Sequence, residues 1–379
     1  MTFAEVIWGE IAMAKVIQLR IRRGDGMEKK QMIKWLVIAV AGLLLAVAAV
    51  TYLFDPFYQY HGPLYGEEVL YDRDYQMAGS VRNLDYDSVI LGSSVAENFD
   101  GDFLEEQYGS EIIKIIRASG SVADLLYYLK QAHGEQDLET VFWCLDIFAL
   151  TAPSEESVTA DKSMKYLYTD TMLDDATYLF NKDVLLKKIP LSLAYSVLDR
   201  NVGGDAYNWA ADKDFSAAGA MRAYQKPEQV AQMQECREEA KYLSRNLDLI
   251  LGEIENNPHI EYIIMFPPYS QMWWDCGYVN GISHMYLQVL EETIPRLVAC
   301  ENVKVYFFMD EQEIICNLDN YMDMIHYAPW VNQYMLDCVV ADTKRVTGDD
   351  VSAVLENMRS VYQYMIEEGI YQYYPRTVS

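Results

Sequence analysis

A run of 20 residues without a charged side chain, from Trp35 to Phe54, constrains this chain more than any other feature. At 1.5 Å per residue, a helix of that length is about 30 Å long, which is the thickness of the hydrocarbon core of a bilayer. A cleaved signal peptide is the alternative interpretation. The run is longer than the apolar part of a typical signal peptide, and no small-x-small cleavage site follows it before Asp55. We therefore favour an uncleaved membrane anchor.

Basic residues flank this run on one side, which predicts its orientation. Lys29, Lys30 and Lys34 precede it, whereas no basic cluster follows it. Lys and Arg near a membrane span stay cytoplasmic. We therefore expect a cytoplasmic tail (residues 1–34), an anchor in the lipid bilayer (35–54) and an extracytoplasmic domain (55–379). Residues 1–26 have no expected role, because the Met27-Glu-Lys-Lys segment is itself typical of a natural start.

The acidic charge of the chain limits its partners. The formal net charge is −27, and residues 1–34 carry more basic than acidic side chains, so the remainder is more acidic still. A nucleic-acid binder needs an excess of Lys and Arg, so we expect no nucleic-acid partner. An anionic polymer would need a local basic site or metal counterions.

The number and spacing of the cysteines and histidines do not indicate a structural metal site or a disulfide framework. The chain has six cysteines, five histidines and no C-x-x-C motif. We expect no metal, no cofactor and mostly free cysteines, with at most one disulfide that the spacing does not assign.

Short apolar runs alternate with helical patterns after residue 85. The runs cover residues 88–91, 112–116, 140–145, 262–266 and 303–308, and helical patterns cover 97–108, 122–133 and 284–300. This alternation predicts an α/β fold with a five-stranded parallel sheet.

Residues 151–258 form an insertion between the third and fourth strands that is too long for an ordinary crossover. It contains the segment 166–180, a polar loop around Gly203-Gly204 and a long amphipathic helix expected near 227–256. Such insertions form lids over an active site or helical buttresses, and the sequence leaves both open. Residues 351–374 are typical of a final helix.

The first predicted strand ends in Gly92-Ser93-Ser94. Open α/β sheets place their active sites at this edge of the sheet. The glycine permits a tight turn, and a helix that begins there would offer amide groups to an oxyanion. Small polar residues are equally common as helix N-caps, so this motif alone does not identify a nucleophile.

Asp323 precedes His326 by three residues, after the fifth predicted strand. We expect both in the first turn of a helix, where this spacing places them on one face. Asp323 would hold one imidazole nitrogen while the other accepts a proton from a serine. Because both motifs follow strands of one sheet, Ser94, Asp323 and His326 form a candidate catalytic triad.

Together, the Gly92-Ser93-Ser94 and Asp323-x-x-His326 blocks resemble the first and last blocks of the SGNH/GDSL hydrolase superfamily, over most of residues 85–340. With its anchor, the chain is similar to the surface-polymer acylation branch, which includes the teichoic-acid D-alanylation D protein, alginate acetylation proteins and anchored proteins of Gram-positive bacteria. The resemblance implies a flavodoxin-like three-layer α/β/α sandwich with strand order 2-1-3-4-5.

The resemblance assigns Ser94 as the nucleophile, His326 as the general base and Asp323 as the residue that orients it. It also implies an oxyanion hole formed by the amides of Ser94 and Gly120.

The third-strand block departs from the family pattern, because Asp146 stands where the family usually has an asparagine. An ionised aspartate cannot donate a hydrogen bond. Asp146 is therefore protonated, binds substrate hydroxyls or has a structural role. Asn98 is an alternative side-chain donor, although a helix-surface residue is the simpler interpretation.

Aromatic residues follow the fourth predicted strand at the same edge of the sheet. Tyr269, Trp273 and Trp274 are candidate substrate-binding residues, because aromatic faces stack on sugar rings and leave their polar groups free to bind hydroxyls. Core packing is the alternative for the two tryptophans.

Two classes of function follow. The first is extracytoplasmic serine-dependent acyl transfer or ester hydrolysis on a cell-surface glycan or teichoic-acid-like polymer. The second is a non-catalytic partner that presents glycan or acyl carrier to a membrane-bound O-acyltransferase. A surface domain with a decayed triad is a third interpretation.

Overall fold

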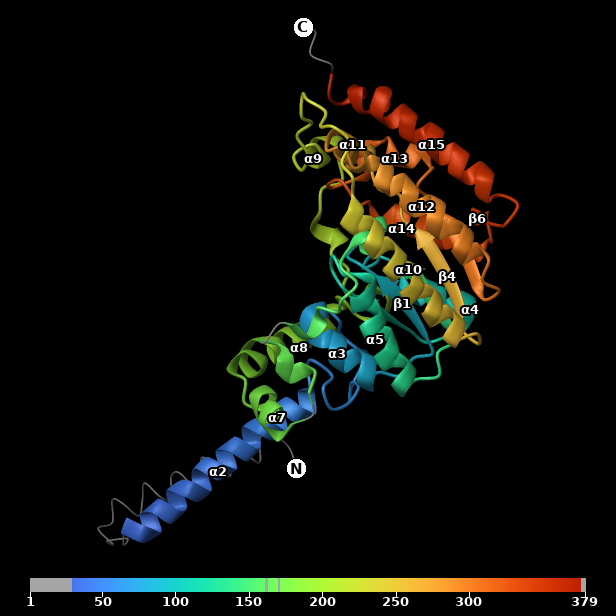
Figure 1. Ribbon diagram of the computed structural model, residues 1–379. Helices are drawn as coiled ribbons and strands as arrows, with labels where there is room; N and C mark the ends of the chain where they lie inside the picture. The colour runs from blue at the N-terminus through green and yellow to red at the C-terminus, as the bar shows by residue number, and fades with distance from the viewer. Residues whose placement is uncertain (1–28, 161–162, 170, 376–379) are drawn as a thin grey trace.

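A mixed six-stranded sheet forms the centre of the protein (Figure 1). The computed structural model describes residues 29–160, 163–169 and 171–375. The strands, in the order β2-β1-β3-β4-β5-β6, are β1 (Ser88–Gly92), β2 (Ile112–Ile116), β3 (Thr140–Cys144), β4 (Glu261–Phe266), β5 (Val303–Phe307) and β6 (Arg345–Val346). The first five are parallel and β6 is antiparallel to β5.

The α/β prediction is confirmed, and the predicted strand count and order are corrected by β6. This strand pairs Arg345 with Tyr306 and Val346 with Val305. Its two residues are too few to give a recognisable pattern in the sequence.

The strands were recognisable because helices bury the sheet on both faces. Every residue of β1, β2 and β3 is buried. Parallel strands that are buried on both faces appear in a sequence as nearly continuous runs of apolar residues. Lys114, in the middle of β2, is the one charged residue among these three strands.

The helices pack as successive neighbours around the sheet. Contacts run from α3 to α5, α10, α12 and α15, and α5 and α10 lie in front of the sheet in Figure 1. The helices of the main domain are α3 (Arg73–Asn83), α4 (Gly101–Tyr108), α5 (Val122–Glu135), α6 (Ile147–Thr151), α10 (Arg237–Asn256), α11 (Gln271–Val279), α12 (Ser283–Val298), α13 (Gln312–Ile315), α14 (Pro329–Val340) and α15 (Val351–Glu367).

Three predicted helix boundaries are wrong. α4 begins at Gly101 rather than at residue 97, because Asp100 caps it by accepting a hydrogen bond from the Phe103 amide at 3.1 Å. α10 begins at Arg237 rather than at 227, because residues 231 and 234 instead donate amide hydrogen bonds to the segment after α11. α15 ends at Glu367, and a short 3₁₀ turn (Gly369–Gln372) follows it.

The predicted anchor is helix α2 (Lys29–Phe54), which extends away from the main domain (Figure 1). Within the described residues it is the one helix long and apolar enough to cross a membrane. Most of the predicted tail, including residues 1–26 and Met27, lies outside the described residues. The six cysteines, all described, are free: 144, 236, 276, 300, 316 and 338.

The insertion contributes α7 (Met172–Leu179), a π-helical turn η3 (Val184–Lys188), α8 (Ile189–Leu198) and α9 (Ala217–Ala220), before α10 returns the chain to the sheet. Both α7 and η3 contact α2, whereas α9 contacts the turn at Leu318–Asn320, near the triad loop. The insertion therefore connects the anchor to the carboxyl edge of the sheet.

Candidate active site

The strand β1 delivers Ser94 to the carboxyl edge of the sheet through a tight turn. A Cβ atom at Gly92 would lie 2.8 Å from the Cβ of Ala96 and 3.2 Å from that of Cys144. Only glycine permits this close approach of the turn to β3. The turn is closed by the Ala96 amide, which donates to the Ser93 carbonyl at 3.0 Å. No helix begins directly behind Ser94, contrary to the sequence prediction.

Ser94, His326 and Asp323 are joined by a continuous chain of hydrogen bonds. The Ser94 Oγ lies 2.8 Å from His326 Nε2, and His326 Nδ1 lies 2.7 Å from Asp323 Oδ2. A carboxylate only accepts hydrogen bonds, so Nδ1 carries the hydrogen and Nε2 is free to accept from the serine hydroxyl. The predicted triad residues are thus brought together from positions 232 residues apart.

Asp323 is held ionised within this arrangement. Its partial burial opposes ionisation, but hydrogen bonds from the His326 ring and from the amides of Ile325 and His326 outweigh that effect. The pKa of Asp323 therefore lies below its usual range. An ionised Asp323 stabilises the imidazolium that forms when His326 takes a proton.

The predicted helical setting of the Asp-x-x-His motif is wrong. Asp323 and His326 lie in a loop closed by an antiparallel bridge between Tyr321 and Tyr327, and α14 begins only at Pro329. The Asp323 Oδ1 accepts the amides of Ile325 and His326, each at 2.9 Å. This side-chain-to-backbone turn, rather than a helix face, places the carboxylate beside the imidazole.

Two contacts fix the histidine loop to its surroundings. The Ser270 Oγ donates to the Met324 carbonyl at 2.8 Å, which fastens the loop to the start of α11. The Asn332 Nδ2 donates to the Val95 carbonyl at 3.0 Å, which ties α14 to the turn that carries Ser94. The distance between Ser94 and His326 is therefore set by buried polar contacts.

The oxyanion donors differ from those that the family resemblance implies. The amide of Gly120 donates to the Arg117 carbonyl at 2.9 Å, so it is occupied within its own turn. The amide of Ser94 donates to no group among the described residues. Asn98 is buried, with its Oδ1 accepting the Trp209 amide at 3.2 Å and its Nδ2 left without an acceptor. Asn98 is therefore not a helix-surface residue, and its side chain does not line the cleft beside Ser94.

Trp209, from the insertion, packs directly on the triad, and sequence reasoning missed it. Its Nε1 donates to the Ser94 carbonyl at 3.2 Å, and its ring meets the His326 ring edge-to-face with centroids 5.2 Å apart. No local pattern marks this residue, because its role depends on how the long insertion folds back. The contact shows that the insertion forms part of the site wall.

Lys114 positions the loop that delivers Trp209. Its Nζ donates to the carbonyls of Glu97, Gly204 and Ala206 at 2.8–2.9 Å, and the side chain is 3% exposed. Burial lowers the pKa of Lys114 to about 8. In the sequence, Lys114 is marked by being the one charged residue within the apolar run Ile112–Ile116.

A cleft of about 600 Å³ opens beside Ser94 and His326. Three basic and three acidic side chains line it, together with one aromatic residue that precedes α3 and three from the insertion: Arg73, Arg200 and Lys213; Asp72, Asp74 and Glu97; Tyr71; Tyr195, Tyr207 and Trp209. Arg73 and the buried Glu97 form an ion pair. The cleft is thus balanced in charge, although the chain as a whole carries −27.

Asp146 lies at the end of β3 in a buried position, where the Tyr269 hydroxyl donates to its Oδ1. Burial raises the pKa of Asp146 to about 6, although Tyr269, Ser93 and His326 favour the charged form. The predicted residues Asp146 and Tyr269 therefore meet each other, and neither lines the cleft.

Trp273 and Trp274 are not brought to the cleft. Trp273 stacks on Tyr286 of α12 with centroids 4.0 Å apart, and Trp274 is fully buried with its ring against Tyr362 of α15. Both tryptophans thus pack between α11, α12 and α15, as in the core-packing alternative.

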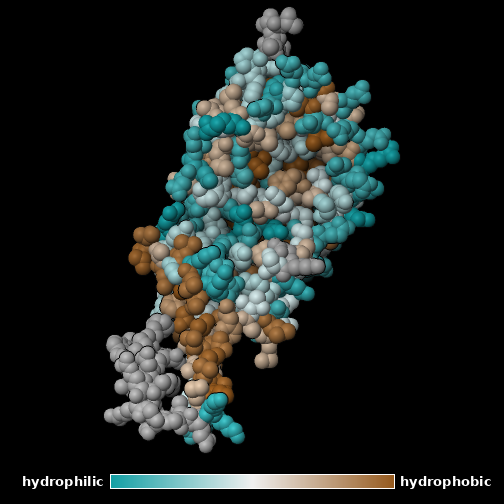
Figure 2. Space-filling view, turned by 90° about the vertical axis from the view of Figure 1, so that its left-hand side faces the viewer, coloured by the Kyte–Doolittle hydropathy of each residue, from teal (hydrophilic) through white to brown (hydrophobic). Residues whose placement is uncertain are grey.

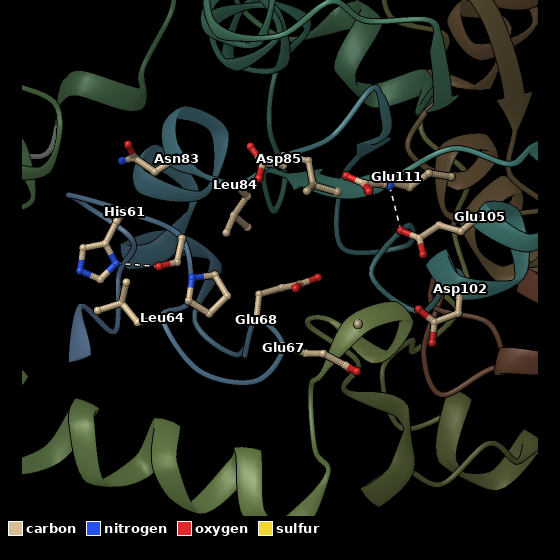
Figure 3. A pocket seen from close by; sticks show the side chains of 15 residues that line it. His61, Leu64, Glu67, Glu68, Asn83, Leu84, Asp85, Asp102, Glu105 and Glu111 are labelled. Atoms are coloured by element: carbon tan, nitrogen blue, oxygen red, sulfur yellow. Dashed lines mark hydrogen bonds between the residues drawn. The ribbon is translucent and has the colours of Figure 1, made fainter. Parts of the chain in front are cut away.

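The largest cavity, about 770 Å³, lies at the opposite, amino-terminal edge of the sheet. Figure 3 shows it surrounded by carboxylates of Glu67, Glu68, Asp85, Asp102, Glu105 and Glu111. Within the described part of the chain, no group of three or more His, Cys, Asp or Glu side chains is arranged to hold a metal ion. The residues that line this cavity include no serine and no cysteine, so they supply no side-chain nucleophile of those types.

The chain matches no protein-family model, no curated protein and no solved structure. The evidence for function at Ser94 is therefore the arrangement of its neighbouring side chains. A hydroxyl, an imidazole and a carboxylate in hydrogen-bond contact, beside an open cleft, form the arrangement that activates a serine for attack on a carbonyl.

Proposed function

We propose that this protein is a membrane-anchored, serine-dependent enzyme of acyl transfer or ester hydrolysis. The observation that carries the proposal is the chain of contacts from Ser94 to His326 and Asp323, with distances of 2.8 and 2.7 Å, at the wall of the cleft. Nucleophile, base and orienting carboxylate are each within the reach that proton transfer requires.

In the proposed reaction, His326 takes the hydroxyl proton as Ser94 attacks an ester or thioester carbonyl. The Ser94 amide, which donates to no other group among the described residues, is the proposed donor to the oxyanion. His326 then gives the proton to the leaving group, which leaves an acyl-serine. Water or a sugar hydroxyl then loses its proton to His326 and attacks the acyl-serine. As the bond between the acyl group and Ser94 Oγ breaks, His326 returns the proton to Oγ.

The proposed setting is the outer face of a membrane. The basic flank of α2 predicts that the domain after it is extracytoplasmic. The proposed fold is the flavodoxin-like three-layer sandwich of the SGNH/GDSL superfamily, extended by β6. A cell-surface glycan or teichoic-acid-like polymer is the proposed acceptor. The cleft, with three basic and three acidic side chains, repels an anionic polymer less than the rest of this acidic chain does.

Turnover of a small ester by the full chain in detergent tests this proposal. Replacing the nucleophile of a triad usually costs several orders of magnitude in rate, so Ser94→Ala is expected to abolish turnover. Ser360→Ala, at an exposed position on α15, is the matched control and should retain it. Near-native turnover by folded Ser94→Ala protein would refute the assignment.

The occupied Gly120 amide and the aspartate at position 146 favour a second candidate, a non-catalytic partner of a membrane-bound O-acyltransferase. A fluorophosphonate probe separates the two candidates, because it labels only an activated serine. Labelling that disappears in Ser94→Ala supports the enzyme, whereas glycan binding without labelling supports the presenting partner.

A further inference from the structure

The helical hairpin formed by α7, η3 and α8 is fixed to the outer end of the anchor helix. The Thr51 Oγ1 of α2 donates to the Leu179 carbonyl at 2.9 Å. The Tyr178 hydroxyl donates to the buried Asp55 at 2.7 Å and accepts the Phe57 amide at 3.2 Å. These contacts join α7 to the last turn of α2 and to the first residues after it, so hairpin and anchor form one unit.

These contacts also set the depth of the hairpin relative to a membrane. Thr51 lies three residues before Phe54, the end of the apolar run, which is about 4.5 Å along a helix. If residues 35–54 fill the hydrocarbon core, α7 meets the anchor at the outer boundary between hydrocarbon and headgroups.

Large apolar side chains of this hairpin point into solvent. Met172, Leu173, Leu186 and Val197 are between 71% and 88% exposed. In Figure 2, apolar surface continues from the anchor helix onto the adjoining part of the domain. Soluble surfaces rarely leave so many large apolar side chains exposed within one short segment. An apolar crevice of about 130 Å³ between Phe54 and Leu193 makes the surface of α2 continuous with that of α8.

The charge of the hairpin fits a lipid surface better than the rest of the chain does. Residues 172–198 contain three lysines and three aspartates, so they are neutral within a chain of net charge −27. An anionic membrane would repel the acidic domain but not this segment. Attachment would depend on burying apolar area in the interface rather than on attraction to anionic lipids.

We propose that the α7–η3–α8 hairpin inserts its exposed apolar side chains into the outer face of the bilayer and forms a second membrane contact beside α2. The inference rests on the proposed role of α2 as a membrane anchor. The hairpin leads directly to the catalytic cleft, because Tyr195 of α8 and the following Arg200 line it. The cleft is therefore held close to the membrane surface, where the substrate is lipid-linked or otherwise confined to that surface.

Site-specific photocrosslinking tests this contact in the full chain. Benzoylphenylalanine replaces Val197 or Leu186, and the protein is reconstituted in vesicles of phosphatidylcholine and phosphatidylglycerol. Met233 is the matched control, because it is apolar and 76% exposed and lies next to Gly281, just after α11. In Figure 1, α11 lies far from the anchor helix α2. We expect lipid adducts at positions 197 and 186 at least fivefold above those at position 233, at both high and low phosphatidylglycerol content.

Lipid adducts at positions 197 and 186 no more frequent than at 233 would overturn the proposal. So would crosslinks in native membranes that join these positions to a protein and not to lipid, since the surface would then be a protein interface. Carbonate extraction of the same membranes tests the anchor separately, because a chain that is released lacks a membrane span. Fluorophosphonate labelling reports on Ser94 independently, so loss of the enzyme assignment and loss of the membrane contact are distinguishable.

Discussion

Replacing Lys114 with methionine is expected to loosen the insertion from the active site while leaving the sheet in place. Methionine keeps the length and apolar character of the side chain but removes the ammonium that donates to the carbonyls of Glu97, Gly204 and Ala206. The loop that carries Trp209 then loses its attachment to β2.

The expected size of the effect follows from two opposing contributions. Hydrogen bonds from a charged donor contribute roughly 1.5–3 kcal/mol each. The burial that lowers the pKa of Lys114 from 10.5 to about 8 costs about 3 kcal/mol, at about 1.36 kcal/mol per pKa unit. Three such bonds outweigh that cost, so we expect a net loss of about 2 kcal/mol in the free energy of unfolding.

Two measurements check this prediction. Denaturant unfolding in detergent gives the change in stability, and the rate of fluorophosphonate labelling reports on Ser94, with an expected decrease of about tenfold, or about 1.4 kcal/mol. Lys130→Met, at an exposed position on α5, is the matched control. If the two variants match in stability within about 0.5 kcal/mol and in labelling rate, the positioning role of Lys114 is refuted.

Three further predictions concern the site itself. Asp146→Asn is expected to stabilise the fold by about 1–3 kcal/mol at pH 7. The pKa of Asp146 is raised to about 6, so the folded state binds more protons than the unfolded state between pH 3.8 and 6. The free energy of unfolding therefore falls as pH rises through that window. Unfolding of the variant, measured across the same pH range, should lack this slope. Trp209→Phe removes one hydrogen bond of about 1 kcal/mol and should slow labelling about fivefold, and an unchanged rate would contradict its role. Asp323→Asn disturbs the tautomer of His326 and should reduce turnover by roughly 10⁴, measured with the small ester.

The sheet and the identity of the triad residues could be predicted because their signals are local. Buried parallel strands such as Ile112–Ile116 are apolar along their whole length, and Gly92 marks a turn where the backbone has no room for a side chain. The distant motifs at Ser94 and His326 could be paired because parallel strands end at one edge of a sheet.

The features that the sequence did not reveal depend on tertiary contacts. The Asp323 carboxylate binds its own backbone amides and so forms a loop where helical spacing suggested a helix. The tryptophan at position 274 suggested a surface for stacking on a sugar ring, but its side chain packs against Tyr362 of α15. Lys114 binds the insertion loop, and Trp209 packs on His326, only because the insertion folds back over the site; no local residue pattern encodes these contacts.

The covalent adduct formed by a fluorophosphonate on the full chain tests the central claim most directly. Peptide mapping by mass spectrometry should place the phosphonate on residue 94, and the His326→Ala variant should form it more slowly by several orders of magnitude. An adduct on another serine, or labelling of residue 94 that is unaffected by loss of the imidazole, would contradict the account.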